Sequence, residues 1–102
     1  MVELTEKNFN EEVANAPLML VDFWASWCGP CRMMAPIVDG LEAKVPGLKV
    51  GKVNVDEEDD LAVRFKVQAI PFLAIFKNGK MVDNLIGLQD ESELIKVINL
   101  HK

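Results

Sequence analysis

Residues 22–36 have the sequence DFWASWCGPCRMMAP and contain the only two cysteines of the 102-residue chain. Cys28 and Cys31 are separated by Gly29 and Pro30. Asp22 lies just upstream in an otherwise apolar run, where burying an ionised carboxylate is costly. The stretch therefore raises two questions, namely what the sulfurs do and why a carboxylate interrupts the apolar run that leads to them.

Two cysteines at this spacing suit a metal site, a structural disulfide or a redox pair. A structural zinc site uses four Cys or His ligands, and the chain adds only one histidine, His101, so a metal would have to be shared between two chains. A disulfide that closes so short a loop contributes only roughly 2 kcal/mol in the chain-entropy model, before strain. The redox pair is the favoured interpretation.

The local pattern supports redox chemistry. The apolar run ends near Ala25, and a helix is predicted from about Cys28 to Val45. Cys28 would then lie at the helix N-terminus, where the dipole favours a thiolate, and Pro30 suits the first turn. Gly29 keeps the first sulfur accessible, whereas the second lies about one turn further into the helix. Cys28 is thus placed to attack a disulfide and Cys31 to resolve the product.

Strands and helices alternate along the chain, which predicts an α/β fold. Strands are expected at residues 2–5, 18–25, 48–55, 72–77 and 80–86, and helices at about 5–15, 28–45, after Asp56 and at about 90–100. Asp56 is expected to cap the third of these helices, and the last is expected to turn Leu94, Ile95, Ile98 and Leu100 inward. The first half supplies βαβ units, which need parallel strands, and Asn78-Gly79 predicts an antiparallel hairpin. The acidic residues 57–60 suit the start of a helix better than a cation site. We expect one domain spanning residues 1–102.

Composition and charge limit the class of partner. The formal net charge of −5 argues against nucleic acid or an anionic membrane surface. The N-terminus is acidic and polar, unlike a secretory signal, and the longest apolar run is too short to span a bilayer. We therefore expect a cytoplasmic protein, a setting in which CxxC pairs are more often catalytic or metal-binding than structural.

The run D-F-W-A-x-W-C-G-P-C at residues 22–31 resembles the active-site signature of the thioredoxin family. Further matching motifs follow in order over essentially the whole chain: Ala35-Pro36, residues 52–56, Ile70-Pro71, residues 76–79 and Gly87. This resemblance implies the thioredoxin fold, a central mixed five-stranded β-sheet flanked by four α-helices on both faces. It also implies general reduction of protein disulfides.

The resemblance assigns roles to both cysteines. Cys28 is the nucleophile that forms a mixed disulfide with the substrate, and Cys31 is the resolving thiol, leaving a Cys28–Cys31 disulfide. The implied partners are disulfide-containing proteins and an NADPH- and flavin-linked thioredoxin reductase, so no cofactor is expected in this chain, which we take to be a monomer. Because no histidine lies between the cysteines, we expect a reductant rather than a disulfide-forming oxidase.

Asp22 has two interpretations. In the first it is structural, as a hydrogen-bonded core residue or one turned to a strand edge. In the second it is the base that accepts a proton from Cys31 during resolution. Burial is expected to raise its pKa. The resemblance supports the base and places Lys52 close to the same carboxylate.

The resemblance also implies a substrate groove. The Ile70–Pro71 bond would be cis and would face the Cys28 sulfur, leaving the preceding backbone free to pair with an extended substrate segment. The implied groove residues are Trp27, Gly29, Pro30, Ala69, Ile70 and Gly87, whereas Trp24 and Phe76 are expected in the core. Phe72 stands where thioredoxins usually have Thr, which affects expected specificity and leaves open whether its ring faces the core or the groove.

Two other functions remain alternatives to the reductase. The chain could be a redox-independent thioredoxin-like binding subunit, which would tolerate loss of both cysteines. It could also be a dimer that binds a metal or cluster, which would be coloured or metal-loaded.

Overall fold

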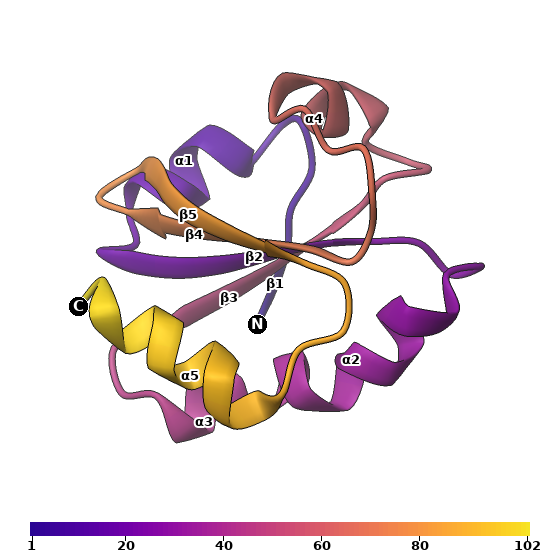
Figure 1. The fold of residues 1–102 in the computed structure, drawn as a ribbon. Helices are drawn as coiled ribbons and strands as arrows, with labels where there is room; N and C mark the ends of the chain where they lie inside the picture. Colours follow the sequence, from indigo (N-terminus) through magenta and orange to yellow (C-terminus); the bar gives the residue numbers. More distant parts are fainter.

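The computed structural model describes all of residues 1–102 and is built on one five-stranded sheet in the order β1-β3-β2-β4-β5 (Figure 1). The strands are β1 (Val2–Glu3), β2 (Leu18–Trp24), β3 (Lys49–Asn54), β4 (Phe72–Lys77) and β5 (Lys80–Ile86). β3 pairs in parallel with β1 and β2, whereas β4 pairs antiparallel with β2 and β5. The mixed sheet predicted from the sequence is confirmed.

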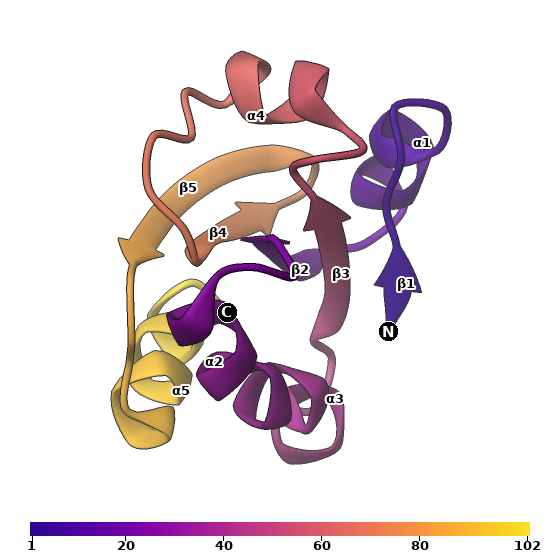
Figure 2. The same ribbon diagram turned by 90° about the vertical axis from the view of Figure 1, so that its right-hand side faces the viewer.

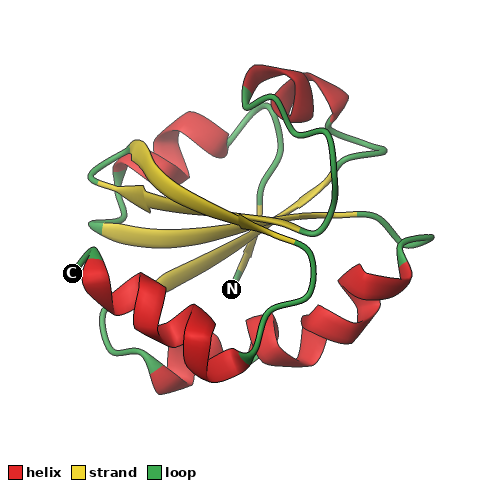
Figure 3. Ribbon diagram, viewed as in Figure 1, coloured by secondary structure: helices red, strands yellow, loops and turns green.

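Helices cover both faces of the sheet. They are α1 (Phe9–Ala14), α2 (Gly29–Asp39), α3 (Leu41–Lys44), α4 (Asp59–Arg64) and α5 (Glu91–Leu100). α1 and α4 lie on one side of the sheet, and α2, α3 and α5 lie on the other (Figures 1 and 3). The helix expected at residues 28–45 is divided at Gly40 into α2 and α3. Taken together as one interrupted helix, these two give the four helices that the resemblance implies.

The central strand β2 is buried on both faces, which explains its nearly continuous apolar sequence. Met19, Val21 and Phe23 pack in the core beneath α1 and α4. Leu18 and Leu20 pack in the second core, beneath α2, α3 and α5. Because side chains alternate along a strand, Asp22 lies on the same face as Leu20, under the helix that begins at the cysteines.

Local turn chemistry fixes the antiparallel half of the sheet. Asn78 and Gly79 have φ values of 52° and 86°, the positive pair that a type I′ hairpin turn requires. The hairpin at this Asn-Gly pair is therefore confirmed. Gly87, with φ of 85°, ends β5 and starts the connection to α5 (Figure 2).

Several local expectations were wrong or incomplete. α4 begins at Asp59 after Glu58, so Asp56 does not cap it, although Asp59 and Asp60 do lie in its first turn as the dipole argument predicts. Leu100 was expected to face inward but is 73% exposed, since it follows Ile98, the last residue of α5 that reaches the core. No helix of the structure has the length and apolar character needed to cross a membrane.

Candidate active site

The cysteines occupy the N-terminal end of α2. Cys28 is the N-cap residue, with extended backbone angles, and its Sγ accepts a hydrogen bond of 3.2 Å from the backbone N–H of Cys31. Pro30 lies in the first turn, where its missing N–H leaves no partner unsatisfied. Both sulfurs are therefore close to the positive end of the helix dipole, which favours thiolate over thiol in the reduced state.

Cys28 and Cys31 are joined as a disulfide, with their Cα atoms 5.2 Å apart. The structure thus represents the oxidised protein, in which both residues are almost wholly buried. They pack against Ala25 and the partly buried Trp24 and Ile70. The two cysteines differ in access, because only Cys28 borders the neighbouring surface pocket.

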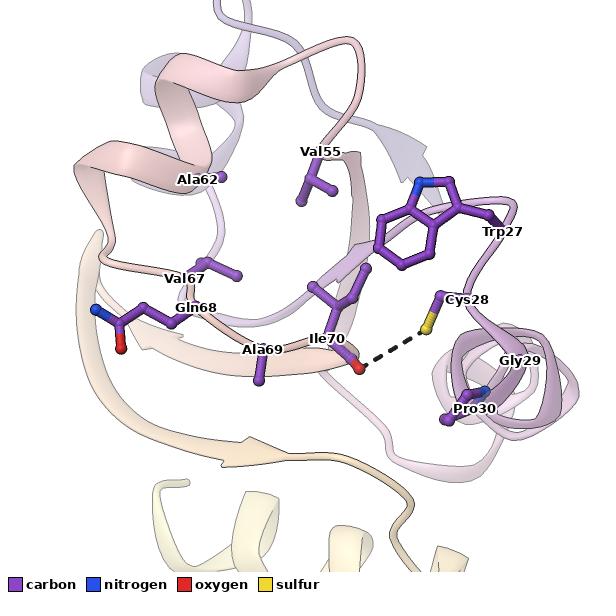
Figure 4. Close-up of a pocket in the computed structure, with 10 residues that line it drawn as sticks. All are labelled: Trp27, Cys28, Gly29, Pro30, Val55, Ala62, Val67, Gln68, Ala69 and Ile70. Carbon is purple, nitrogen blue, oxygen red and sulfur yellow. Dashed lines mark hydrogen bonds between the residues drawn. The ribbon is translucent and has the colours of Figure 1, made fainter.

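That pocket has a volume of about 590 Å³ and is mainly apolar (Figure 4). Its lining residues are Trp27, Cys28, Gly29, Pro30, Val55, Ala62, Val67, Gln68, Ala69 and Ile70. Trp27 and Ile70 lie close to Cys28, whereas Val67 and Gln68 lie at the opposite end (Figure 4). The structure therefore brings five of the six implied groove residues into one pocket around the Cys28 sulfur.

Gly87 does not line this pocket, although it adjoins the site. Its N–H donates a hydrogen bond of 2.9 Å to the carbonyl oxygen of Pro71. Conversely, Val55, Ala62 and Val67 line the pocket without having been predicted. They come from the residue that follows β3, from α4 and from its connection to β4, and no local pattern marks them, since only the tertiary fold brings these segments beside α2.

Trp27 is 67% exposed but its indole is held in place. Its Nε1–H donates a hydrogen bond of 2.9 Å to Oδ2 of Asp56. The backbone N–H of Asp56 in turn donates to the side-chain oxygen of Asn54 at 3.0 Å. Asp56, which the sequence suggested as a helix cap, thus orients the indole beside Cys28, an interaction that sequence reasoning missed.

The Ile70–Pro71 bond is cis, as the resemblance implies. The carbonyl oxygen of Ile70 lies 3.7 Å from Sγ of Cys28, a contact drawn as a dashed line in Figure 4. The N–H and C=O groups of Gln68, Ala69 and Ile70 make no backbone–backbone hydrogen bonds. These groups are therefore free to pair with an extended chain entering the pocket.

Phe72 belongs to the core, which answers the question left open by the sequence. It is 5% exposed and lies in the cluster beneath α1 and α4. Its ring packs edge-to-face against Phe23, with centroids 5.7 Å apart. Phe76 is likewise buried in this cluster, as expected, whereas Trp24 is only partly buried.

Asp22 is buried, with 1% exposure, and its Oδ1 atom has no hydrogen-bond partner. Burial raises its pKa to about 6, opposed by the positive charge of Lys52 and assisted by the negative charge of Asp39. Lys52 is the residue opposite Asp22 on β3. Its Nζ donates to Oδ1 of Asp39 at 3.3 Å and lies 5.4 Å from the ring centroid of Trp24.

A mixed sheet that carries a Cys-Gly-Pro-Cys disulfide at a helix N-terminus, facing an apolar pocket, defines a thiol–disulfide oxidoreductase. The thioredoxin family model matches residues 1–100. The chain is 45% identical over 98 residues to thioredoxin from Chlamydia caviae, covering 96% of this chain and 95% of that protein. It is 40% identical over 102 residues to thioredoxin from Staphylococcus haemolyticus, covering 99% and 97%.

Solved structures agree with this result. A mutant thioredoxin from Halobacterium salinarum NRC-1 matches with a TM-score of 0.91 and 34% identity, covering 99% of this chain and 88% of that one. The chain therefore belongs to the thioredoxin family. It is a protein disulfide reductase that works through the Cys28–Cys31 pair, and its partners are disulfide-containing proteins and a reductase that restores the dithiol.

Proposed function

We propose that Cys28 is the nucleophile of this reductase and that Cys31 is its resolving thiol. The observation that carries this assignment is the difference in access, since Cys28 borders the pocket and Cys31 does not. A substrate disulfide therefore reaches Cys28 first. The helix N-terminus favours the thiolate that the attack requires.

The reaction transfers two electrons to the substrate in two exchange steps. The Cys28 thiolate attacks one substrate sulfur, forming a mixed disulfide and releasing the other substrate sulfur as a thiolate. Cys31 then loses its proton and attacks Sγ of Cys28, which breaks the mixed disulfide and releases the second substrate thiolate. The substrate is reduced to a dithiol, and the chain is left with the disulfide seen in the structure.

Asp22 accepts the proton of Cys31 in the second step. Its position under α2, the unpartnered Oδ1 and the pKa of about 6 support this role. A carboxyl with this pKa is mostly ionised at neutral pH, yet it is a stronger base than an exposed aspartate. Lys52 tunes this pKa by favouring the ionised form.

The proposal for Asp22 has a direct kinetic test. Asp22→Asn slows resolution of a preformed mixed disulfide near neutral pH in a single-turnover assay, while the fold is retained. Equal resolution rates for the variant and the wild type across pH 6–9 would rule out this base.

Substrates bind as extended segments over the pocket. Trp27, Gly29 and Pro30 form one wall, and Ala69 and Ile70 offer unpaired backbone groups on the other. Pro71 holds Ile70 in place, and Gly87 extends the surface beyond the pocket through its hydrogen bond to the Pro71 carbonyl.

The wider setting is also part of the proposal. Residues 1–102 act as one domain and as a monomer in the cytoplasm, with a flavoprotein reductase that draws on NADPH and no cofactor bound to the chain itself. Family membership supports this setting, and the net charge of −5 speaks against a nucleic-acid partner.

Dithiothreitol-driven reduction of insulin tests the assignment of the cysteines. The wild type accelerates the reaction, and Cys28→Ser abolishes the acceleration. In a separate incubation from which dithiothreitol has been removed, prereduced Cys31→Ser accumulates a mixed disulfide with insulin that persists on a non-reducing gel. Trapping through Cys31 in a Cys28→Ser variant would reverse the two roles. If the Cys28→Ser, Cys31→Ser double variant fully replaces the wild type in cells that lack this protein, the redox-independent binding subunit is favoured instead.

A further inference from the structure

Residues 86–89, which comprise the last residue of β5 and the first part of its connection to α5, run beside α2 (Figures 1 and 2) and are bonded on both sides. On one side, the N–H of Gly87 donates to the carbonyl oxygen of Pro71 at 2.9 Å. On the other, the backbone N–H of Gln89 donates to the thioether Sδ of Met34 at 3.4 Å. The side-chain amide of Gln89 also donates to the carbonyl oxygen of Ile86 at 3.0 Å, which closes the turn. We call residues 86–89 the β5–α5 loop.

Met34 is fully buried in α2, one helical turn after Cys31. It belongs to the core cluster that also holds Leu73 and Leu94, and packing alone would be served by a Leu or Ile at this position. Only a methionine offers a hydrogen-bond acceptor there, since its thioether sulfur is a weak acceptor. The sulfur therefore does something that the core does not require, because it satisfies the N–H of the partly buried Gln89.

We propose that Met34 is a positioning residue for substrate binding, which acts by holding the β5–α5 loop against α2. This loop links the two sides of the site. α2 carries both cysteines, and Pro71 follows Ile70, whose carbonyl oxygen lies 3.7 Å from Sγ of Cys28. Bonds to Met34 and to Pro71 at either end of the loop therefore fix the separation of these two sides.

The loop also presents exposed apolar side chains next to Gly87. Ile86 is 54% exposed and Leu88 is 52% exposed. Their position sets how much apolar surface a protein substrate meets beyond the pocket. The inference rests on the proposed substrate surface around Cys28, and it concerns binding rather than the exchange chemistry.

Met34→Leu removes the acceptor while nearly conserving volume, a kind of change that cores tolerate well. Met33→Leu is the matched control, because Met33 is on the same helix and 64% exposed. Amide hydrogen exchange at Gln89, measured by NMR on the oxidised proteins, should be about threefold or more faster in Met34→Leu alone, as expected for loss of one weak hydrogen bond. The KM for insulin should rise about two- to threefold by the same argument, with kcat unchanged and with reduction of a small aromatic disulfide unaffected.

Val38→Ala separates positioning from general loosening of the core. Val38 is buried on the same face of α2, so its truncation lowers stability without touching the N–H···S contact. The proposal is overturned by unchanged Gln89 exchange in Met34→Leu, by an equal rise of KM in Val38→Ala, or by faster exchange with an unchanged KM. None of these outcomes bears on the reductase activity itself, which is tested separately by insulin reduction with the wild type. If Met34→Leu does not fold, Met34→Ile lacks the same acceptor and takes its place.

Discussion

The buried carboxyl of Asp22 makes a quantitative prediction about stability. Its pKa rises from an ordinary value of 3.8 to about 6 in the folded protein. Because a tenfold change in an ionisation constant corresponds to about 1.4 kcal/mol, this difference corresponds to about 3 kcal/mol. The folded state has the higher pKa, so it binds the proton more tightly than the unfolded state does. The favourable contribution of the protonated form is complete below pH 3.8 and is lost as the pH rises through about 6.

Asp22→Asn removes this ionisation and should stabilise the protein in a pH-dependent way. At pH 8 the variant should be more stable than the wild type by up to about 3 kcal/mol, and at pH 4 the advantage should fall below about 1 kcal/mol. The buried amide also needs hydrogen-bond partners, so the value at pH 8 is an upper bound. The change in the stability advantage between pH 4 and pH 8 does not depend on that penalty, because the penalty is the same at both pH values.

Urea unfolding of the oxidised proteins at pH 4, 6 and 8 measures this difference. The oxidised form is the right one, since neither sulfur titrates while Cys28 and Cys31 are bonded. Met33→Leu, at an exposed position on α2, removes no ionisable group, so it is the control and should show no such pH dependence. A stability difference between Asp22→Asn and the wild type that stays constant from pH 4 to pH 8 would refute the reasoning.

Three further predictions concern the surroundings of the site. Asp56→Ala should free the Trp27 indole, lowering its fluorescence anisotropy and raising the KM for insulin about two- to threefold with little change in melting temperature. Burial alone would raise the pKa of Glu42, but hydrogen bonds from the amino terminus and from a backbone N–H of β3 outweigh it and lower this pKa. Glu42→Gln should therefore destabilise the protein at neutral pH in urea unfolding. The loss of stability should shrink as the pH falls through the lowered pKa. Gly51→Ala should destabilise by roughly 1–2 kcal/mol in urea unfolding, since an added Cβ would lie 2.5 Å from Cδ1 of Leu4; an unaltered midpoint would contradict that packing.

Features that depend on local chemistry could be predicted from the sequence. The apolar run of β2 predicts a strand that is buried on both faces, and Asn78-Gly79 predicts the hairpin. The division between α2 and α3 was missed because the apolar spacing continues through Gly40, although that residue favours a break. The sequence predicts a cap at Asp56, whereas the structure pairs Asp56 with Trp27, which lies 29 positions away in the chain. No local rule can choose between a nearby backbone amide and a distant indole.

The cost of Asp22 also bears on why a carboxylate interrupts the apolar strand that leads to the cysteines. A leucine at this position would avoid a penalty of about 3 kcal/mol at neutral pH, a large fraction of the stability of a typical domain. Stability alone therefore does not account for Asp22, and its unpartnered Oδ1 excludes a carboxylate fixed by hydrogen bonds on both oxygens. Burial both destabilises the ionised form and makes it a stronger base. The same pKa thus links the two variant experiments: if Asp22 is the base, Asp22→Asn should be both more stable than the wild type and slower to resolve the mixed disulfide above about pH 6.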